Sequence, residues 1–173
     1  MLRLLLHFGI IDKETIALNR ERAERMIELY PVSEENVPDF ADTSYSEMSD
    51  DERLCMICES KKKEHEGAYF EILAVCDEGQ IVGFMSLFAH SEYTISISPE
   101  IKRSFRGRGY GFLGEQEALR CAKSLGYTMA TASVRKDNPA SIALHTKLGF
   151  EECEQRLSRN GNPIYVFEKR LDA

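Results

Sequence analysis

A short stretch near the middle of the chain, residues 101–114, combines the residue types that bind phosphate groups. Its four glycines, which let a backbone approach a ligand without obstruction from Cβ atoms, are Gly107, Gly109, Gly111 and Gly114. Its four cations, in a chain with a net charge of −7, are Lys102, Arg103, Arg106 and Arg108. An expected strand precedes the stretch and an expected helix follows it, so the N–H groups at the positive end of that helix would face a bound anion. We therefore interpret the stretch as a phosphate-binding loop.

Two common phosphate-binding motifs do not account for this loop. The P-loop sequence GxxxxGK[ST] is absent. The GxGxxG pattern of dinucleotide-binding folds occurs at 109–114, but that interpretation requires an acidic residue about 20 positions further on to bind the ribose. No Asp or Glu lies between Ala118 and Lys136, and the strands expected before the loop form hairpins rather than a parallel unit. Nucleotide binding of this kind is therefore the less favoured alternative.

The loop also fits a motif of one enzyme family. Residues 106–111, RGRGYG, match the [QR]xxGx[GA] motif of the GNAT family of N-acetyltransferases, and residues 134–150, VRKDNPASIALHTKLGF, are similar to that family's second signature. The chain therefore resembles the GNAT family, specifically over residues 69–155 and only in its order of elements over 1–68. The resemblance implies one acetyltransferase domain over 1–173, in which 69–155 bind acetyl-CoA and 1–68 form a variable part on the acceptor side.

The resemblance also implies a fold and a place for acetyl-CoA. We expect an α/β (α+β) fold on a mixed, mostly antiparallel sheet of about seven strands, with helices on both faces. The fourth and fifth strands, here 93–98 and 127–134, would splay apart around acetyl-CoA, and no metal is expected. The residues expected to bind acetyl-CoA are Ile97, Ser98, Arg106, Gly107, Arg108, Gly109, Tyr110, Gly111 and Asn138.

These residues take their expected roles from the family. Backbone amides of 106–111 would bind the pyrophosphate. Ile97 and Ser98 would pair with the pantetheine arm, and the Ile97 amide would stabilise negative charge on the thioester oxygen. Asn138 would lie near the cofactor arm, cap its helix, or do both.

One departure from the family pattern lies directly before the loop. Family members commonly read V-x-P-E-Y-R-G-x-G, whereas here Ile101–Ser104 separates Pro99-Glu100 from Phe105-Arg106. This insertion makes the connection longer and more basic. Its two cations would reach the pyrophosphate or the 3′-phosphate, or the insertion would shift the register of the strand.

Acetylation of an amine requires two proton transfers, because only a neutral amine attacks the thioester and because the departing thiolate gains from a general acid. His145 occupies the position at which many family members carry a Tyr acid, and an imidazolium can donate a proton near neutral pH. We favour Glu92 as the general base. The weaker candidates are Tyr110 and Ser141 for the acid and His90 and Glu71 for the base. The change from Tyr to His supports an alternative function, a non-catalytic domain that binds or senses acyl-CoA.

The remaining sequence predicts the elements that position this loop. We expect a strand over 1–8, a helix over 12–30, an irregular acidic segment over 31–48 and a helix over 50–65 that begins with a capping box at Ser49. Strands follow at 69–76, 81–90 and 93–98, the last ending at Pro99. A helix over 111–124, a strand over 128–134 and a helix between Asn138 and Gly149 come next, and strands over 150–157 and 163–170 end the chain.

The net charge and the cysteine content limit the classes of partner that the chain is expected to bind. The net charge of −7 argues against a nucleic-acid binder. Residues 33–52 contain many carboxylates and neither Lys nor Arg, which indicates either a solvated loop or a wall that attracts a cationic amine, on a small metabolite or a protein. We expect Cys55 and Cys58 to pack inward from one face of their helix rather than bind a metal.

Apolar runs are too short for a membrane span, and the start of the chain does not fit a signal peptide, so we expect a cytoplasmic protein. The family resemblance also allows a homodimer.

Overall fold

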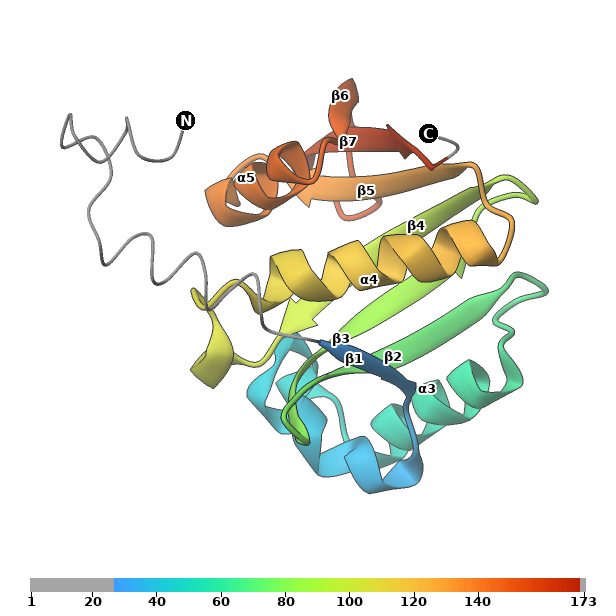
Figure 1. The fold of residues 1–173 in the computed structure, drawn as a ribbon, viewed down its shortest axis with the longest axis vertical. Helices are drawn as coiled ribbons and strands as arrows, with labels where there is room; N and C mark the ends of the chain where they lie inside the picture. Colours follow the sequence, from blue (N-terminus) through green and yellow to red (C-terminus); the bar gives the residue numbers. More distant parts are fainter. Residues whose placement is uncertain (1–26, 172–173) are drawn as a thin grey trace, which may run out of the picture.

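A seven-stranded mixed sheet runs through residues 27–171, the part of the chain that the computed structural model describes (Figure 1). Its order is β1-β2-β3-β4-β5-β7-β6. The strands are β1 (Glu28–Pro31), β2 (Phe70–Asp77), β3 (Gln80–Ala89), β4 (Thr94–Ile101), β5 (Met129–Arg135), β6 (Glu151–Leu157) and β7 (Pro163–Arg170). The helices are η1 (Glu34–Asp42), η2 (Ser44–Glu47), α3 (Asp50–Lys62), η3 (Arg103–Phe105), α4 (Tyr110–Ser124) and α5 (Pro139–Lys147), where η marks a 3-10 helix. The expected fold class is confirmed.

Strands β4 and β5 are parallel neighbours that stay together for only part of their length. Their register pairs Thr94–Ser96 of β4 with Met129–Thr131 of β5. Because β4 continues to Ile101 and β5 to Arg135, the two strands separate toward their C-terminal ends, as Figure 1 shows. The splay expected between the fourth and fifth strands is confirmed.

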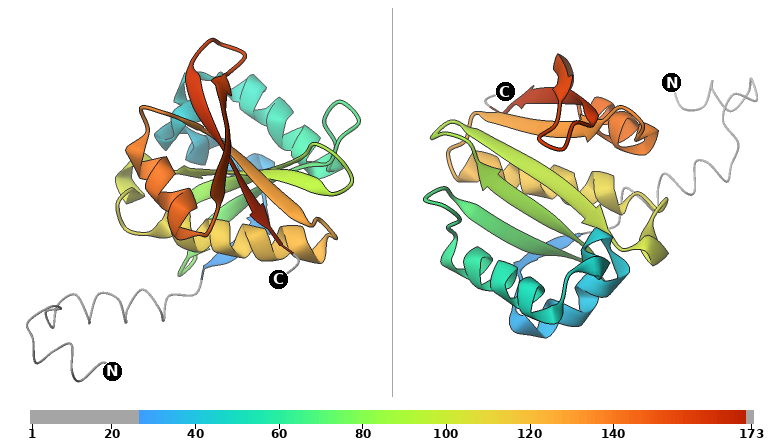
Figure 2. Two further views of the ribbon diagram at one scale, coloured as in Figure 1. Left: turned by 90° about the horizontal axis from the view of Figure 1, so that it is seen from above. Right: turned by 180° about the vertical axis from the view of Figure 1, so that it is seen from behind.

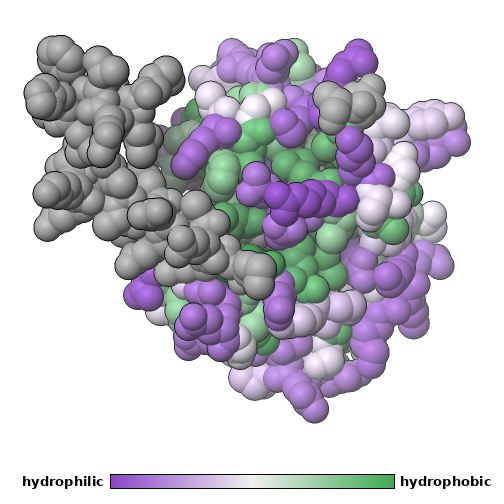
Figure 3. Space-filling view, in the orientation of Figure 1, coloured by the Kyte–Doolittle hydropathy of each residue, from purple (hydrophilic) through white to green (hydrophobic). Residues whose placement is uncertain are grey.

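Helices cover both faces of the sheet, as expected (Figure 2). Helix α4 packs on one face, over a core that includes Val75 and Met85. Helices η1 and α3 cover the other face, where the ring of Phe40 stacks on that of Phe84 with 3.9 Å between centroids. Strand β2 lies between these two cores, which explains why its sequence FEILAVC is apolar almost throughout. In Figure 3, the face that carries α4 shows a hydrophobic area surrounded by hydrophilic side chains.

The helix ends follow their sequence signals. Ser49 and Glu52 form the expected capping box of α3. Asn138 caps α5 by accepting a hydrogen bond from the Ser141 N–H at 3.1 Å. Gly149 follows α5 with a φ of 81°, in the left-handed region that glycine adopts without strain. Among residues 27–171, no helix has the length and apolar content needed to cross a membrane.

The N-terminal expectations are only partly testable. The expected strand over 1–8 and most of the helix over 12–30 lie outside the described residues. The expected end of that helix is wrong, because Glu28–Pro31 forms strand β1 and pairs with β2. The segment after it is not irregular, since η1 and η2 occupy most of 34–47. The helical pattern of residues 28–30 is local, and the pairing of these residues with the apolar strand β2 has the stronger effect on their conformation.

The sequence predicted that the strand over 93–98 ends at Pro99, but strand β4 continues past this residue. Pro99 pairs with Met85 of β3, and the strand continues to Ile101. Past Ser96, β5 has moved away, so this part of β4 behaves as an edge strand, where a missing backbone N–H is tolerated.

The cysteines of α3 do not pack inward. Cys55 and Cys58 are both exposed. The buried side chains of α3 are Arg53, Ile57 and Ser60, at the helical spacing of four and three residues. This stripe fixes the buried face of the helix, and both cysteines fall outside it.

Candidate active site

A cavity of about 440 Å³ lies at the C-terminal end of β4. The end of β4, the glycine-rich loop (residues 105–109), the first turn of α4 and one side of α5 contribute to its wall. Its lining residues are Pro99, Glu100, Ile101, Phe105, Arg106, Gly107, Gly109, Tyr110, Gly111, Phe112, Asn138, Ala140, Ser141 and Leu144. The structure therefore brings the two sequence signatures, the loop and the start of α5, to one site.

The loop reaches α4 through two glycines in the left-handed region. Gly107 has a φ of 77° and Gly109 a φ of 89°. Gly109 is the N-cap of α4 and has no side chain that could accept from the first-turn N–H groups. No acidic residue occupies that first turn. The start of α4 can therefore offer backbone donors and the positive end of the helix dipole to an anion.

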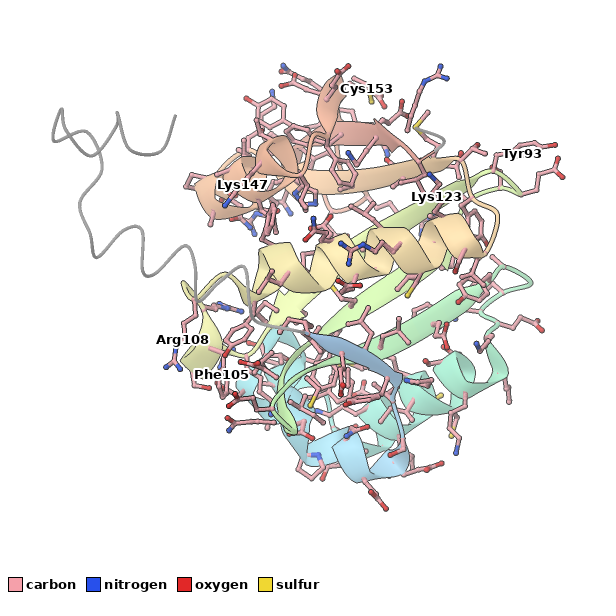
Figure 4. The ribbon with its side chains drawn as sticks, in the orientation of Figure 1. Tyr93, Phe105, Arg108, Lys123, Lys147 and Cys153 are labelled. Atoms are coloured by element: carbon pink, nitrogen blue, oxygen red, sulfur yellow. The ribbon has the colours of Figure 1, made fainter. Side chains whose placement is uncertain are left out.

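The two arginines of the loop differ in their position. Arg106 lines the cavity, and its guanidinium donates to Glu100 Oε1 at 3.0 Å and to the Ile101 carbonyl at 3.1 Å. Arg108 does not line the cavity; it donates to the Ser104 carbonyl at 3.1 Å and lies over the Phe105 ring. Figure 4 shows Phe105 and Arg108 together near the start of α4.

Ile97 and Ser98 lie at the point where β4 and β5 part. They directly follow Ser96, the last residue of β4 in the register with β5. The Ile97 side chain is buried in the core beneath α4, whereas Ser98 is exposed. Neither side chain lines the cavity, so a role in binding a cofactor arm would rest on their backbone groups.

His145 lies in the interior rather than on the helix surface. Its side chain is 3% exposed, and its Nε2 lies 3.3 Å from Oε1 of Glu115, whose side chain is 0% exposed. Its Nδ1 donates to the Ser141 carbonyl at 2.7 Å. The rings of Phe150 and Phe167 flank the imidazole. His145 therefore does not line the cavity and instead links α5 to α4.

The His145–Glu115 contact perturbs the imidazole. Burial by itself lowers the pKa of His145, but the contacts with Glu115 and with the Ser141 carbonyl outweigh it and raise that pKa above the usual value. Within the described residues, the Glu115 oxygens and His145 Nε2 have no hydrogen-bond partner of good geometry. The two groups are thus mainly each other's electrostatic partners in a buried setting.

The structure does not bring Glu92 to the cavity or to His145. Glu92 is exposed in the turn between β3 and β4. Figure 4 shows its neighbour Tyr93 at the opposite end of the molecule from Arg108. Of the alternative bases, Glu71 is buried and paired with Lys63 at 3.0 Å, and the His90 ring lies against Phe88. None of these three residues lines the cavity.

The predicted role of the insertion in phosphate contact is not supported by its position. Neither Lys102 nor Arg103 lines the cavity. Lys102 Nζ lies 2.6 Å from Asp39 Oδ1, and Arg103 donates to Ser46 Oγ at 3.0 Å. Both cations therefore turn away from the cavity toward η1 and η2.

Several lining residues were missed by the sequence reasoning. Ala140 and Leu144 share one side of α5 with Ser141, and a helical wheel starting at Asn138 would have identified that side. Phe105 and Phe112 flank the loop, but their apolar types gave no chemical signal. No group of three or more His, Cys, Asp or Glu within 27–171 could hold a metal ion.

Comparisons with known proteins agree with this geometry. A family model described as acetyltransferase (GNAT) family matches residues 24–150. L-methionine sulfoximine/L-methionine sulfone acetyltransferase of Pseudomonas aeruginosa is 31% identical over 88 residues, which are 47% of this chain and 51% of that relative. The chain thus spans about half the length of this curated relative.

Two solved structures share the fold. An N-acetyltransferase from Staphylococcus aureus Mu50 matches with a TM-score of 0.70 and 22% identity, covering 85% of this chain and 99% of that one. The yncA protein from Salmonella typhimurium, solved with acetyl-CoA, matches with a TM-score of 0.66 and 18% identity, covering 86% of this chain and 95% of that one. At these identities the likeness concerns the fold alone.

Proposed function

The chain belongs to the acetyltransferase (GNAT) family, whose model matches residues 24–150, and on this premise we propose that it transfers an acetyl group from acetyl-CoA to a primary amine. One observation carries the proposal: the cavity wall combines a glycine-capped helix start with the open end of the β4–β5 splay. Backbone donors at the helix start suit a diphosphate, and the splay offers unpaired strand backbone to an extended arm.

The shape of the loop fits a diphosphate. Gly107 lines the cavity, and a Cβ added there would meet no described atom within 4 Å. This open space beside the first turn of α4 is where phosphate oxygens would approach the backbone. Arg106, on the same wall, would add a guanidinium to the site.

The reaction joins the amine nitrogen to the acetyl carbon and breaks the bond between that carbon and sulfur. The amine loses a proton and the departing thiolate gains one, so that the products are an N-acetylated amine and coenzyme A. Acetyl-CoA supplies the acetyl group as a thioester. In this proposal, the Ile97 N–H donates to the thioester oxygen as negative charge develops there.

The two catalytic roles stay predictions. Glu92 as base would need a water or a bound amine to connect it with the splay, since it lies in the turn before β4. His145 as acid would need its ring to leave its buried partners, Glu115 and the Ser141 carbonyl. A structural role for His145 is therefore the interpretation that the geometry favours.

The acidic segment gives little support for a cationic acceptor. Several of its carboxylates are engaged within the protein: Glu34 with Lys61, Asp39 with Lys102, Asp42 with Ser104 and Asp50 with Arg53. The curated relative is named for acetylating L-methionine sulfoximine and sulfone. We therefore propose the amine of a small molecule as the acceptor, with a peptide amine as the second candidate.

Thiol release from acetyl-CoA tests the proposal. The assay compares the protein alone with the protein plus a panel of amino acids, polyamines and peptide N-termini. Thiol release that depends on an amine is expected. The alternative function, binding of acyl-CoA without transfer, is favoured by the buried position of His145, and it would show as retention of CoA with no amine-dependent release.

A further inference from the structure

Residues 102–104 of the insertion, which lie between β4 and the glycine-rich loop, contact helices η1 and η2. Lys102 Nζ lies 2.6 Å from Asp39 Oδ1. Ser104 donates to Asp42 Oδ2 twice, from its backbone N–H at 3.2 Å and from its hydroxyl at 2.6 Å. Two residues of the insertion, Lys102 and Ser104, thus bind to carboxylates of η1.

A second set of contacts extends this attachment to both sides of the insertion. Arg103 donates to Ser46 Oγ at 3.0 Å. Ser44 donates to Glu100 from its backbone N–H at 3.2 Å and from its hydroxyl at 2.7 Å. Glu100 also accepts from the Arg106 guanidinium at 3.0 Å. A cavity-lining arginine is therefore linked through one carboxylate to η2.

The Lys102–Asp39 pair is more than a solvated surface pair. The Lys102 and Asp39 side chains are 13% and 29% exposed. The hydrogen bonds from Ser104, followed by the nearby charges of Arg103 and Lys102, lower the pKa of Asp42 below its usual value. The carboxylate of Asp42 therefore stays ionised, and stays an acceptor, throughout the neutral pH range.

We propose that the contacts of Asp39 and Asp42 with Lys102 and Ser104 form a latch, which positions the glycine-rich loop for its phosphate ligand. The latch rests on the proposed function, since it acts on the loop that would bind acetyl-CoA. Asp39, Asp42, Lys102 and Ser104 are positioning residues, because none of them lines the cavity. The family resemblance would place η1 and η2 on the acceptor side, and on that expectation the latch would also couple acceptor binding to acetyl-CoA binding.

The variant Asp39→Asn distinguishes this proposal from direct phosphate binding by Lys102, because the two predict opposite changes in the affinity for CoA. If Lys102 were a phosphate ligand held back by Asp39, removing the carboxylate charge would release the cation and tighten CoA binding. The latch predicts weaker binding, by about five- to tenfold, comparable to typical coupling between sites. The dissociation constant for CoA, measured by calorimetry on the full chain, gives the answer.

Glu34→Gln is the matched control. Glu34 lies in the same helix η1 and pairs with Lys61 at 2.6 Å, but it makes no contact with the insertion among the described residues. It should leave the dissociation constant unchanged. Ser104→Ala, which keeps every charge, should weaken binding in the same direction as Asp39→Asn, and it serves as the second variant if Asp39→Asn fails to fold.

The effect of the acceptor amine on the affinity for CoA is a second measurement, which a purely structural role of the latch would leave unchanged. In the wild type, a saturating acceptor amine should change the affinity for CoA, and Asp39→Asn should reduce that change while Glu34→Gln preserves it. Unchanged or tighter CoA binding by both Asp39→Asn and Ser104→Ala would overturn the latch alone. Failure of the wild type to bind CoA would instead overturn the proposed function, and the latch with it.

Discussion

At the scale of single residues, the glycines of the loop offer the most direct test of the cavity. Gly107→Asp places a carboxylate against the expected phosphates and should weaken CoA binding at least tenfold, about 1.4 kcal/mol. The dissociation constant, measured by calorimetry, checks this outcome.

Gly161→Asp separates the charge effect from backbone strain. Gly161, in the turn between β6 and β7, has a φ of 75°, close to the 77° of Gly107, and an added Cβ at either position meets no atom within 4 Å. Both variants should therefore lose similar stability, while only Gly107→Asp loses affinity. An equal loss of affinity in the two would contradict the assignment of the loop.

The buried His145–Glu115 pair predicts a strong dependence on both partners. Truncating one partner leaves a buried group uncompensated, so Glu115→Leu should lower the free energy of unfolding by about 3–5 kcal/mol. The double variant Glu115→Leu/His145→Phe should recover part of that loss. Urea denaturation of the four proteins of this cycle measures the coupling.

The pH dependence of this pair has a definite sign. Because the folded pKa of His145 is raised above the usual 6.5, the stability from its protonation is fully present below that value and is lost as the pH rises through the folded pKa. The double variant should lack this loss. Turnover distinguishes the two roles of His145: a general acid predicts that His145→Phe lowers kcat much more than Glu115→Leu does, whereas a purely structural pair predicts similar losses of kcat in the two variants.

At the scale of elements, helix α5 carries a residue with two candidate roles. Asn138 caps α5 and also lines the cavity. Asn138→Ala should cost about 1 kcal/mol of stability, and Asn138→Ser should retain most of it because Ser is also a good N-cap. If Asn138 also contacts the cofactor arm, both variants should weaken CoA binding; equal affinity in Asn138→Ser and the wild type would leave capping as its role.

The β4–β5 splay shows how elements create a site that no single residue specifies. The strands pair at Thr94–Ser96 and then part, and the cavity forms where β4 continues alone toward the loop. Pro99 fits this arrangement because it sits on the part of β4 that has lost its neighbour. The separation of the strands leaves the end of β4 without β5 beside it, and in the proposed function the backbone groups there would be available to a ligand.

At the scale of the whole molecule, ligand binding should stabilise the fold. A ligand that binds only the folded state adds about 2.7 kcal/mol at 100 times its dissociation constant. CoA should therefore raise the thermal midpoint of unfolding, and NAD at the same concentration should not. A shift with NAD and none with CoA would instead support the dinucleotide alternative for the 109–114 glycines.

The whole molecule also brings together two segments that the sequence keeps far apart. The segments around 39–46 and 100–106 are distant in sequence but lie against each other through the latch contacts. Lys102 of the second segment pairs with Asp39 of the first, and Ser104 donates to Asp42, so these two carboxylates are engaged within the protein. The local charge of 33–52 is consequently a poor guide to the charge of an acceptor.

The sequence by itself determined the features that depend on local chemistry. The glycines and cations of 106–111 singled out a loop that the structure places on the cavity wall, and Ser49, Asn138 and Gly149 marked helix ends where the structure has them. These signals are readable because caps and left-handed turns are set by residues within a few positions of each other. The order of strands and helices from 69 onward followed from the same local patterns.

Only the tertiary structure decided which partners the ionisable residues have. It turned His145 toward Glu115, turned Lys102 toward Asp39, left Glu92 exposed and outside the cavity wall, and exposed Cys55 and Cys58. Each outcome depends on the packing of one element against another that is remote in sequence. The type and spacing of residues within one element do not show which remote element packs against it. The loop proposed to bind through its backbone could therefore be predicted from the sequence, whereas the partners of the charged side chains are known only from the fold.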